Sequence, residues 1–251
     1  MKQLFSLSCV IALSLCSSAA PAPPDVKPCP DCAPLGIVFV VNGSNDVYCL
    51  SDSMHMIVSY KKLPLQVETI PWCRYGKATW DHTDYEAQMA AAKNLAVMIQ
   101  HYRQVCPNGP VYLIGHSAGT HVVLEAAGSL PPDTIERIAL LAPSVSNHYD
   151  LRAALRASRR GIANFYSTQD EVVSLGVAML GTADRRSGKP AGETGFAPPP
   201  NCPDADLYCK LRQYYWRPEI ARATGHLGGH NGFTRAGYLE ACVLPLLFGG
   251  H

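Results

Sequence analysis

Residues 111–121 read VYLIGHSAGTH: a short apolar run, a glycine-flanked serine, and the start of a helix-forming segment. Residues 111–114 predict a buried strand, and residues 120–127 predict a helix. Between them, Gly115, Ser117 and Gly119 form a G-x-S-x-G motif, whose glycines permit a tight turn that larger residues would block. Such a turn lifts the Ser117 hydroxyl out of the sheet and places it at a helix N-terminus, where the helix dipole favours a developing negative charge.

The sequence on both sides of this motif alternates between predicted strands and predicted helices. Helical spacing of apolar residues predicts helices at 84–104 and 235–248, and continuous apolar runs predict buried strands at 35–41, 65–71, 137–142 and 161–167. This alternation predicts an α/β fold: an open, mostly parallel sheet with helices on both faces and no large cap domain. Residues 80–85 are expected to form a turn, and the glycine- and proline-rich residues 181–201 a long loop, which is the main lid candidate.

The GHSAG stretch at residues 115–119, in its strand-to-helix context, resembles the α/β-hydrolase superfamily of the lipase and esterase type, over residues 35–251. The resemblance implies the chain order serine, acid, histidine. Asp170 follows the predicted strand 161–167 and is the expected acid. Two alternatives stay open here: Asp170 could instead be a helix N-cap, and its neighbour Glu171 could be the acid if the register shifted.

The glycine-rich residues 225–232 (GHLGGHNG) precede the last predicted helix, where the resemblance places the catalytic histidine. His230 is the preferred general base, because it is closer to the helix and has glycines nearby; His226 is the alternative. A serine hydroxyl is a poor nucleophile at neutral pH, so it needs an imidazole to take its proton and a carboxylate to fix the imidazole tautomer. Ser117, His230 and Asp170 are therefore the predicted catalytic residues.

The oxyanion formed during such a reaction needs two preorganised hydrogen-bond donors. The backbone N–H of Ala118, the residue after the nucleophile, is the first. The second is expected from the loop after the first core strand, where the N–H of Gly43 or Ser44 is the candidate. The alternative is that Asn42 and Gly43 form only a turn.

The N-terminal residues have the order of a secretory signal peptide. Lys2 precedes an apolar stretch at residues 4–15 and then small residues, so residues 1–19 are expected to be removed on export. Residues 20–34 are expected to form a proline-rich linker, and residues 35–251 the catalytic domain. The protein is thus predicted to be secreted or periplasmic. A lipid anchor at Cys16 is less favoured, because Leu15 stands where its processing would need a small residue.

Eight cysteines follow the predicted signal peptide, an even number that indicates disulfides in an exported chain. The best local pairing is Cys202 with Cys209. The closely spaced Cys29 and Cys32 are expected to have a structural role as a bridge or staple. The eight residues are Cys29, Cys32, Cys49, Cys73, Cys106, Cys202, Cys209 and Cys242.

Composition narrows the function further. A formal net charge of +1 over 251 residues gives no support for nucleic acid as a partner, and no later apolar stretch predicts a stable membrane span. Asp81, His82 and Asp84 fit no zinc signature, so neither a metal nor another cofactor is expected. The predicted function is cleavage of a small-molecule or lipid carboxylic ester through an acyl-enzyme. The alternatives are a thioesterase or phospholipase-type acyl hydrolase, or a non-catalytic binding protein; the oligomeric state stays open.

Overall fold

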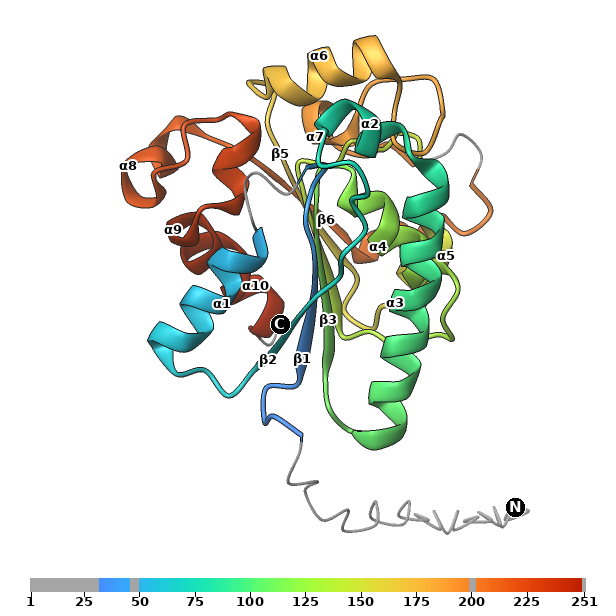
Figure 1. The fold of residues 1–251 in the computed structure, drawn as a ribbon, viewed down its shortest axis with the longest axis vertical. Coiled ribbons are helices and arrows are strands. Elements are labelled where there is room, and N and C mark those ends of the chain that lie inside the picture. Colours follow the sequence, from blue (N-terminus) through green and yellow to red (C-terminus); the bar gives the residue numbers. More distant parts are fainter. Residues whose placement is uncertain (1–31, 46–49, 199–201, 250–251) are drawn as a thin grey trace, which may run out of the picture.

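The computed structural model describes residues 32–45, 50–198 and 202–249 and is built around one parallel sheet (Figure 1). The predicted signal peptide, almost all of the predicted linker, and Cys16, Cys29 and Cys49 lie outside these residues. Six strands pair in the order β2-β1-β3-β4-β5-β6, and every pairing among the described residues is parallel. The strands are β1 (Ile37–Val41), β2 (Gln66–Thr69), β3 (Val111–His116), β4 (Arg137–Leu141), β5 (Ile162–Tyr166) and β6 (Leu211–Tyr215).

Helices cover both faces of the sheet, which confirms the predicted fold class. On one face lie α3 (Tyr85–Val105), α4 (Gly119–Gly128) and α5 (Arg152–Ala157); on the other lie α1 (Leu50–Lys61), α8 (Ala221–Thr224), α9 (Ala236–Tyr238) and α10 (Leu244–Phe248) (Figure 1). Side chains of a strand alternate between its faces. Accordingly, Phe39 and Val41 of β1 belong to the core under α3 and α4, while Val38 and Val40 belong to the core under α1 and α9. All residues of β1, β3 and β4 are buried.

A third group of helices lies beyond the carboxyl ends of the strands (Figure 1). It consists of α2 (Ala78–Thr83), α6 (Glu171–Leu180) and α7 (Ala191–Thr194), and α2 contacts α6. Residues 80–85 therefore do not form the predicted turn. Helix α2 continues to Thr83, Asp84 is the N-cap of α3, and α3 begins at Tyr85. The predicted loop 181–201 contains α7. The sequence did not predict α6, whose residues, EVVSLGVAML, are mostly apolar, although only Val173 and Val177 are buried in the structure.

The C-terminal segment differs in detail from the single helix predicted at 235–248. Between α9 and α10 the chain forms one π-helical segment, Leu239–Val243. Pro245 lies in the first turn of α10, where its missing N–H costs little. Strand β6 was also missed, since its residues are exposed or half-buried and it carries Arg212 and Gln213. Short 3₁₀ helices complete the described chain at Ala205–Lys210, Pro218–Ile220 and His230–Thr234.

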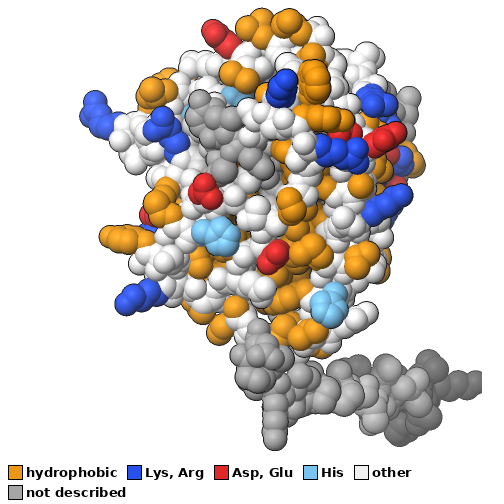
Figure 2. Space-filling model, viewed as in Figure 1, with side chains coloured by type: hydrophobic (Ala, Val, Ile, Leu, Met, Phe, Trp, Pro, Cys, Tyr) orange, Lys and Arg blue, Asp and Glu red, His pale blue; other side chains and the backbone are white. Residues whose placement is uncertain are grey.

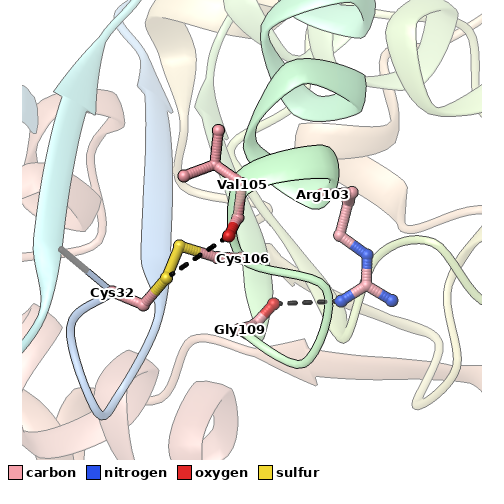
Figure 3. The surroundings of a disulfide bond; sticks show 5 residues. All are labelled: Cys32, Arg103, Val105, Cys106 and Gly109. Carbon is pink, nitrogen blue, oxygen red and sulfur yellow. Dashed lines mark hydrogen bonds between the residues drawn. A yellow bond between two sulfur atoms is a disulfide. The ribbon is translucent and has the colours of Figure 1, made fainter. Parts of the chain in front are cut away.

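A disulfide between Cys32 and Cys106 ties the start of the domain to the end of α3, with the two Cα atoms 5.9 Å apart (Figure 3). Nearby, Arg103 donates a hydrogen bond to the Gly109 carbonyl across the turn after α3. Cys32 is therefore a structural staple, as expected, but its partner is not Cys29. The pairing of Cys202 with Cys209 is wrong: both are free thiols, and Cys209 belongs to the 3₁₀ helix 205–210 rather than to a loop that doubles back.

No helix of the described part of the chain combines the length and apolar character needed to cross a membrane.

Candidate active site

Ser117 occupies the sharp turn between β3 and α4. Its φ of +52° lies in the left-handed region, and its N–H donates to the Leu141 carbonyl at 3.0 Å. A Cβ added to Gly119 would lie 2.3 Å from the Asn42 carbonyl oxygen, and one added to Gly115 would lie 3.0 Å from the Thr120 Cα. Both motif glycines are thus required by close packing against β1 and α4, as the sequence predicted.

The turn lies where the strand order changes direction. β1 and β3 are neighbours in the sheet. After β1 the chain adds β2 on one side of this pair, and after β3 it adds β4 on the opposite side. The crevice at such a switch point is the usual ligand site of an open α/β sheet. Here a cavity of about 320 Å³ lies at this place, and Gly43, Ser44, His116, Ser117 and His230 line it.

Asp170 and His230 meet beside this cavity. Asp170 is fully buried after β5, and its Oδ2 lies 2.7 Å from Nδ1 of His230, which is itself 7% exposed. The other oxygen, Oδ1, accepts the Val173 N–H at 2.9 Å and caps α6. The N-cap role considered as an alternative therefore coexists with the contact to histidine. Since Nδ1 faces a carboxylate, it carries the proton, and Nε2 of His230 is left as a proton acceptor.

His226, the alternative histidine, lies elsewhere in the loop. It is completely buried against Phe233 and Tyr238, and its Nδ1 accepts the Gly228 N–H at 3.0 Å. Burial lowers the pKa of His226 to about 4. Its ring therefore stays neutral and supports the loop that carries His230, while the ring next to Asp170 is that of His230.

His116 contacts His230 from below the cavity, a contact that the sequence did not predict. Its Nε2 donates to the His230 carbonyl at 3.2 Å, and the ring centroids are 4.6 Å apart. Burial holds the pKa of His116 well below its ordinary value, with the nearby His230 acting in the same direction. A neutral His116 thus positions the backbone of His230 without adding a second positive charge.

The loop after β1 brings Gly43 against the nucleophile. A Cβ on Gly43 would lie 2.9 Å from His116 Nδ1 and 3.0 Å from Ser117 Cβ, so only glycine fits there. None of the hydrogen bonds found within the described residues uses the N–H of Gly43 or Ala118. Ala118 directly precedes α4, where N–H groups have no partner inside the helix. Ser44 lines the same cavity, and its Oγ is buried without a partner in the described structure.

Ser51 and Trp72, which the sequence did not single out, hold this loop through Asn42. The Asn42 side chain donates to Ser51 Oγ at 2.9 Å and accepts the Ser51 N–H at 3.0 Å, while the Asn42 carbonyl accepts Trp72 Nε1–H at 2.8 Å. Asn42 and Trp72 are both buried. The interpretation of Asn42 and Gly43 as a simple turn missed these contacts, which depend on residues up to 30 positions away.

The outer walls of the cavity come from α2 and α6. Helix α6 supplies Val173, Gly176, Val177 and Leu180, and α2 supplies Ala78, Thr79 and His82. Nε2 of His82 lies 2.9 Å from the Gly181 carbonyl and so joins the end of α2 to the end of α6; burial lowers the pKa of this histidine. No Asp or Glu is among the described residues that line the cavity.

The acidic residues near His82 have structural roles. Asp81 is buried and accepts backbone N–H groups from Arg74, Tyr75 and Lys77, and Asp84 caps α3. Within the ranges that the structure describes, no group of three His, Cys, Asp or Glu residues is arranged to hold a metal ion.

Comparison with known proteins gives a family match for part of the chain. The sequence pattern of the family described as serine aminopeptidase, S33, matches residues 75–174, which include both Ser117 and Asp170. This match supports the resemblance to the α/β-hydrolase superfamily that the GHSAG stretch carries. No curated protein matches this chain in sequence.

Solved structures similar to this chain include an extracellular α/β-hydrolase from a Paenibacillus species (13% identity, 85% of this chain and 99% of that chain, TM-score 0.46). Another is the catalytic core domain of acetyl xylan esterase from Trichoderma reesei (15% identity, 80% and 92%, TM-score 0.42). A third is a cutinase-like protein from a Cryptococcus species (13% identity, 88% and 98%, TM-score 0.43).

Proposed function

We propose that this protein is a serine hydrolase that cleaves carboxylic esters through Ser117, His230 and Asp170. The observation that carries the proposal is the 2.7 Å contact between Asp170 and His230 at the rim of the cavity that Ser117 lines. A buried carboxylate that fixes the tautomer of an imidazole beside a serine turn is the arrangement that makes a serine hydroxyl nucleophilic.

The reaction follows from these positions. His230 Nε2 takes the proton of Ser117 as Oγ attacks the ester carbonyl, and the N–H groups of Gly43 and Ala118 stabilise the oxyanion. The tetrahedral intermediate collapses, and the leaving alcohol takes the proton from His230. Water then attacks the acyl-enzyme by the same steps and releases the acid. No metal or organic cofactor takes part in this scheme.

Esters are preferred over peptides as substrates. A peptidase that reads a free amino terminus needs a negative charge near the scissile bond, and the described lining of the cavity carries no carboxylate. The wall formed by α6 and α2 is instead mostly apolar, which suits an uncharged acyl chain. A thioester or phospholipid substrate would use the same groups and differs only in the leaving group.

Hydrolysis of p-nitrophenyl esters of graded chain length by purified protein tests the proposal, with Ser117→Ala as the control variant. A fluorophosphonate should label Ser117 in the unsubstituted protein, and Ser117→Ala should lose both labelling and turnover. A folded protein that neither reacts with the fluorophosphonate nor hydrolyses any ester would instead be a binding protein on a hydrolase scaffold.

We also propose that the enzyme is exported. The order of residues 1–19 supports this, and the Cys32–Cys106 disulfide fits an oxidising compartment. Sequencing the N-terminus of protein recovered from the periplasm or culture fluid should give Ala20 as the first residue. An uncleaved Met1 would contradict export by a signal peptide.

A further inference from the structure

A second depression, of about 590 Å³, adjoins the cavity described above. Val172, His230 and Asn231 line both, so the two spaces meet at His230. Ser117 lines only the first. The second is bordered by the start of α1 and by the loop that carries His230, through Asp52, Ser53, Gly225, Leu227, Gly229, Gly232, Thr234 and Arg235.

The proposed chemistry separates the two parts of an ester between these spaces. The acyl group stays bonded to Ser117 and therefore remains in the first cavity. The alcohol oxygen must come within hydrogen-bond reach of His230, which protonates it as it leaves. The space on the other side of His230 is thus the place where the rest of the alcohol can extend.

The charges around the depression favour an uncharged alcohol. Asp52 and Arg235 are exposed, and neither forms an ion pair with another described residue. Because their charges have opposite sign, the pair gives no net attraction for a phosphate or for a quaternary ammonium group. Together, a carboxylate and a guanidinium offer both hydrogen-bond acceptors and donors. The Asn231 side chain adds an amide oxygen that accepts and an NH2 group that donates.

Two exposed apolar side chains complete the lining. Val172 is 59% exposed and Leu227 is 76% exposed. Hydrophobic side chains also gather over α6 at the top of the view in Figure 2. A ring that carries hydroxyl groups presents polar edges and a C–H face, and this lining matches both.

We infer that the depression is the alcohol subsite, and that the alcohol is an uncharged, hydroxyl-rich group. This inference rests on the proposed ester hydrolysis. It assigns the recognition of the alcohol to Asp52, Arg235 and Asn231, and the recognition of the acyl chain to the wall formed by α6 and α2.

The test compares two esters of the same acid, methyl 6-O-butyryl-glucoside and hexyl butyrate, both kept below their solubility limits, by the rate of butyrate release. The double variant Asp52→Ala/Arg235→Ala should raise the ratio of the glucoside KM to the hexyl KM at least five-fold. Gly229→Leu should raise both KM values, because a Cβ at Gly229 meets no atom within 4 Å and the leucine side chain can extend into the depression that both alcohols would occupy. Its φ of −82° suits any residue.

Glu219→Ala/Arg222→Ala is the matched control. It removes the same two charges from exposed positions that line neither space, and it should leave both KM values unchanged. An unchanged KM ratio in the Asp52/Arg235 variant, together with unchanged KM values in Gly229→Leu, would overturn the alcohol subsite. Failure of the proposed function looks different, since Ser117 would then resist the fluorophosphonate and neither butyrate ester would be cleaved.

Discussion

Asp170 holds His230 with one carboxylate oxygen, Oδ2 to Nδ1 at 2.7 Å, and caps helix α6 with the other, Oδ1 to the Val173 N–H at 2.9 Å. One buried side chain therefore fixes both the proposed base and the helix that forms a wall of the cavity. Substitutions at Asp170 can separate these two roles, because asparagine caps a helix as well as aspartate does.

Asp170→Asn should lower kcat by about 10³- to 10⁴-fold, since an amide cannot stabilise the imidazolium or enforce the correct tautomer. The free energy of unfolding should change little, because the amide oxygen can still accept the Val173 N–H. Asp170→Ala should lose the cap as well, which costs about 1 kcal/mol more. Steady-state kinetics and urea unfolding measure the two effects. Glu171→Gln, at the exposed next position, is the control, and an active Asp170→Asn enzyme would show that His230 has another partner.

Gly176→Leu should shift the acyl preference toward shorter chains. Gly176 lies within α6 and lines the cavity, and a Cβ placed there meets no atom within 4 Å. A leucine side chain would therefore occupy space that a long acyl group needs. We expect the ratio of kcat/KM for p-nitrophenyl octanoate to that for the acetate to fall at least ten-fold.

Measurements of the free energy of unfolding show whether a changed chain-length profile comes from the filled cavity or from misfolding. Gly176→Ala should raise the free energy of unfolding by about 0.5 to 1 kcal/mol, since glycine is a poor residue within a helix. Ala178→Leu, on the same helix but outside the cavity lining, should leave the chain-length profile unchanged. Equal profiles in Gly176→Leu and in the unsubstituted enzyme would place the acyl chain elsewhere.

His226 should make the protein less stable in acid. Its folded pKa of about 4 lies below the ordinary 6.5, so between these values the unfolded chain binds more protons than the folded one. The contribution of His226 to the free energy of unfolding is therefore complete above pH 6.5. It decreases as the pH falls toward 4, and the total loss is about 3 kcal/mol.

The variant His226→Asn isolates this contribution. The asparagine oxygen can accept the Gly228 N–H in place of Nδ1, but it does not titrate. Urea unfolding at pH 7.5 and pH 4.5 should show a smaller difference between the two pH values for His226→Asn than for the unsubstituted protein. The same pH dependence in both proteins would mean that other groups cause the acid sensitivity.

Removal of the disulfide through Cys32→Ser/Cys106→Ser should lower the free energy of unfolding. The two residues are 74 positions apart, and closing a loop of that length in the unfolded chain is worth about 4 kcal/mol in the chain-entropy model. Urea unfolding without reductant measures the loss. Cys202→Ser/Cys209→Ser, which removes two free thiols, should change stability by less than about 1 kcal/mol, and an equally large loss there would point to a disulfide between those two residues in solution.

The sequence by itself determined strands β1 to β5 of the sheet and the position of Ser117, because these depend on local features. Buried parallel strands appear as continuous apolar runs, and the turn at 115–119 needs glycines at fixed spacing on either side of the serine. The expected order of Ser117, Asp170 and a later histidine came from the family resemblance. That resemblance places each residue after a predicted strand or before a predicted helix.

Only the tertiary structure decided features that depend on distant residues. His226 and His230 share one glycine-rich loop, and their local sequence gave only a preference for His230. The packing of His226 against Phe233 and Tyr238 separates their roles. Helix α6 buries only Val173 and Val177, and it is fixed by its cap at Asp170 and its contact with α2. Cys106 lies 74 residues from Cys32. Sequence spacing could not predict this pairing, because only the folded chain brings the two residues together at the end of α3.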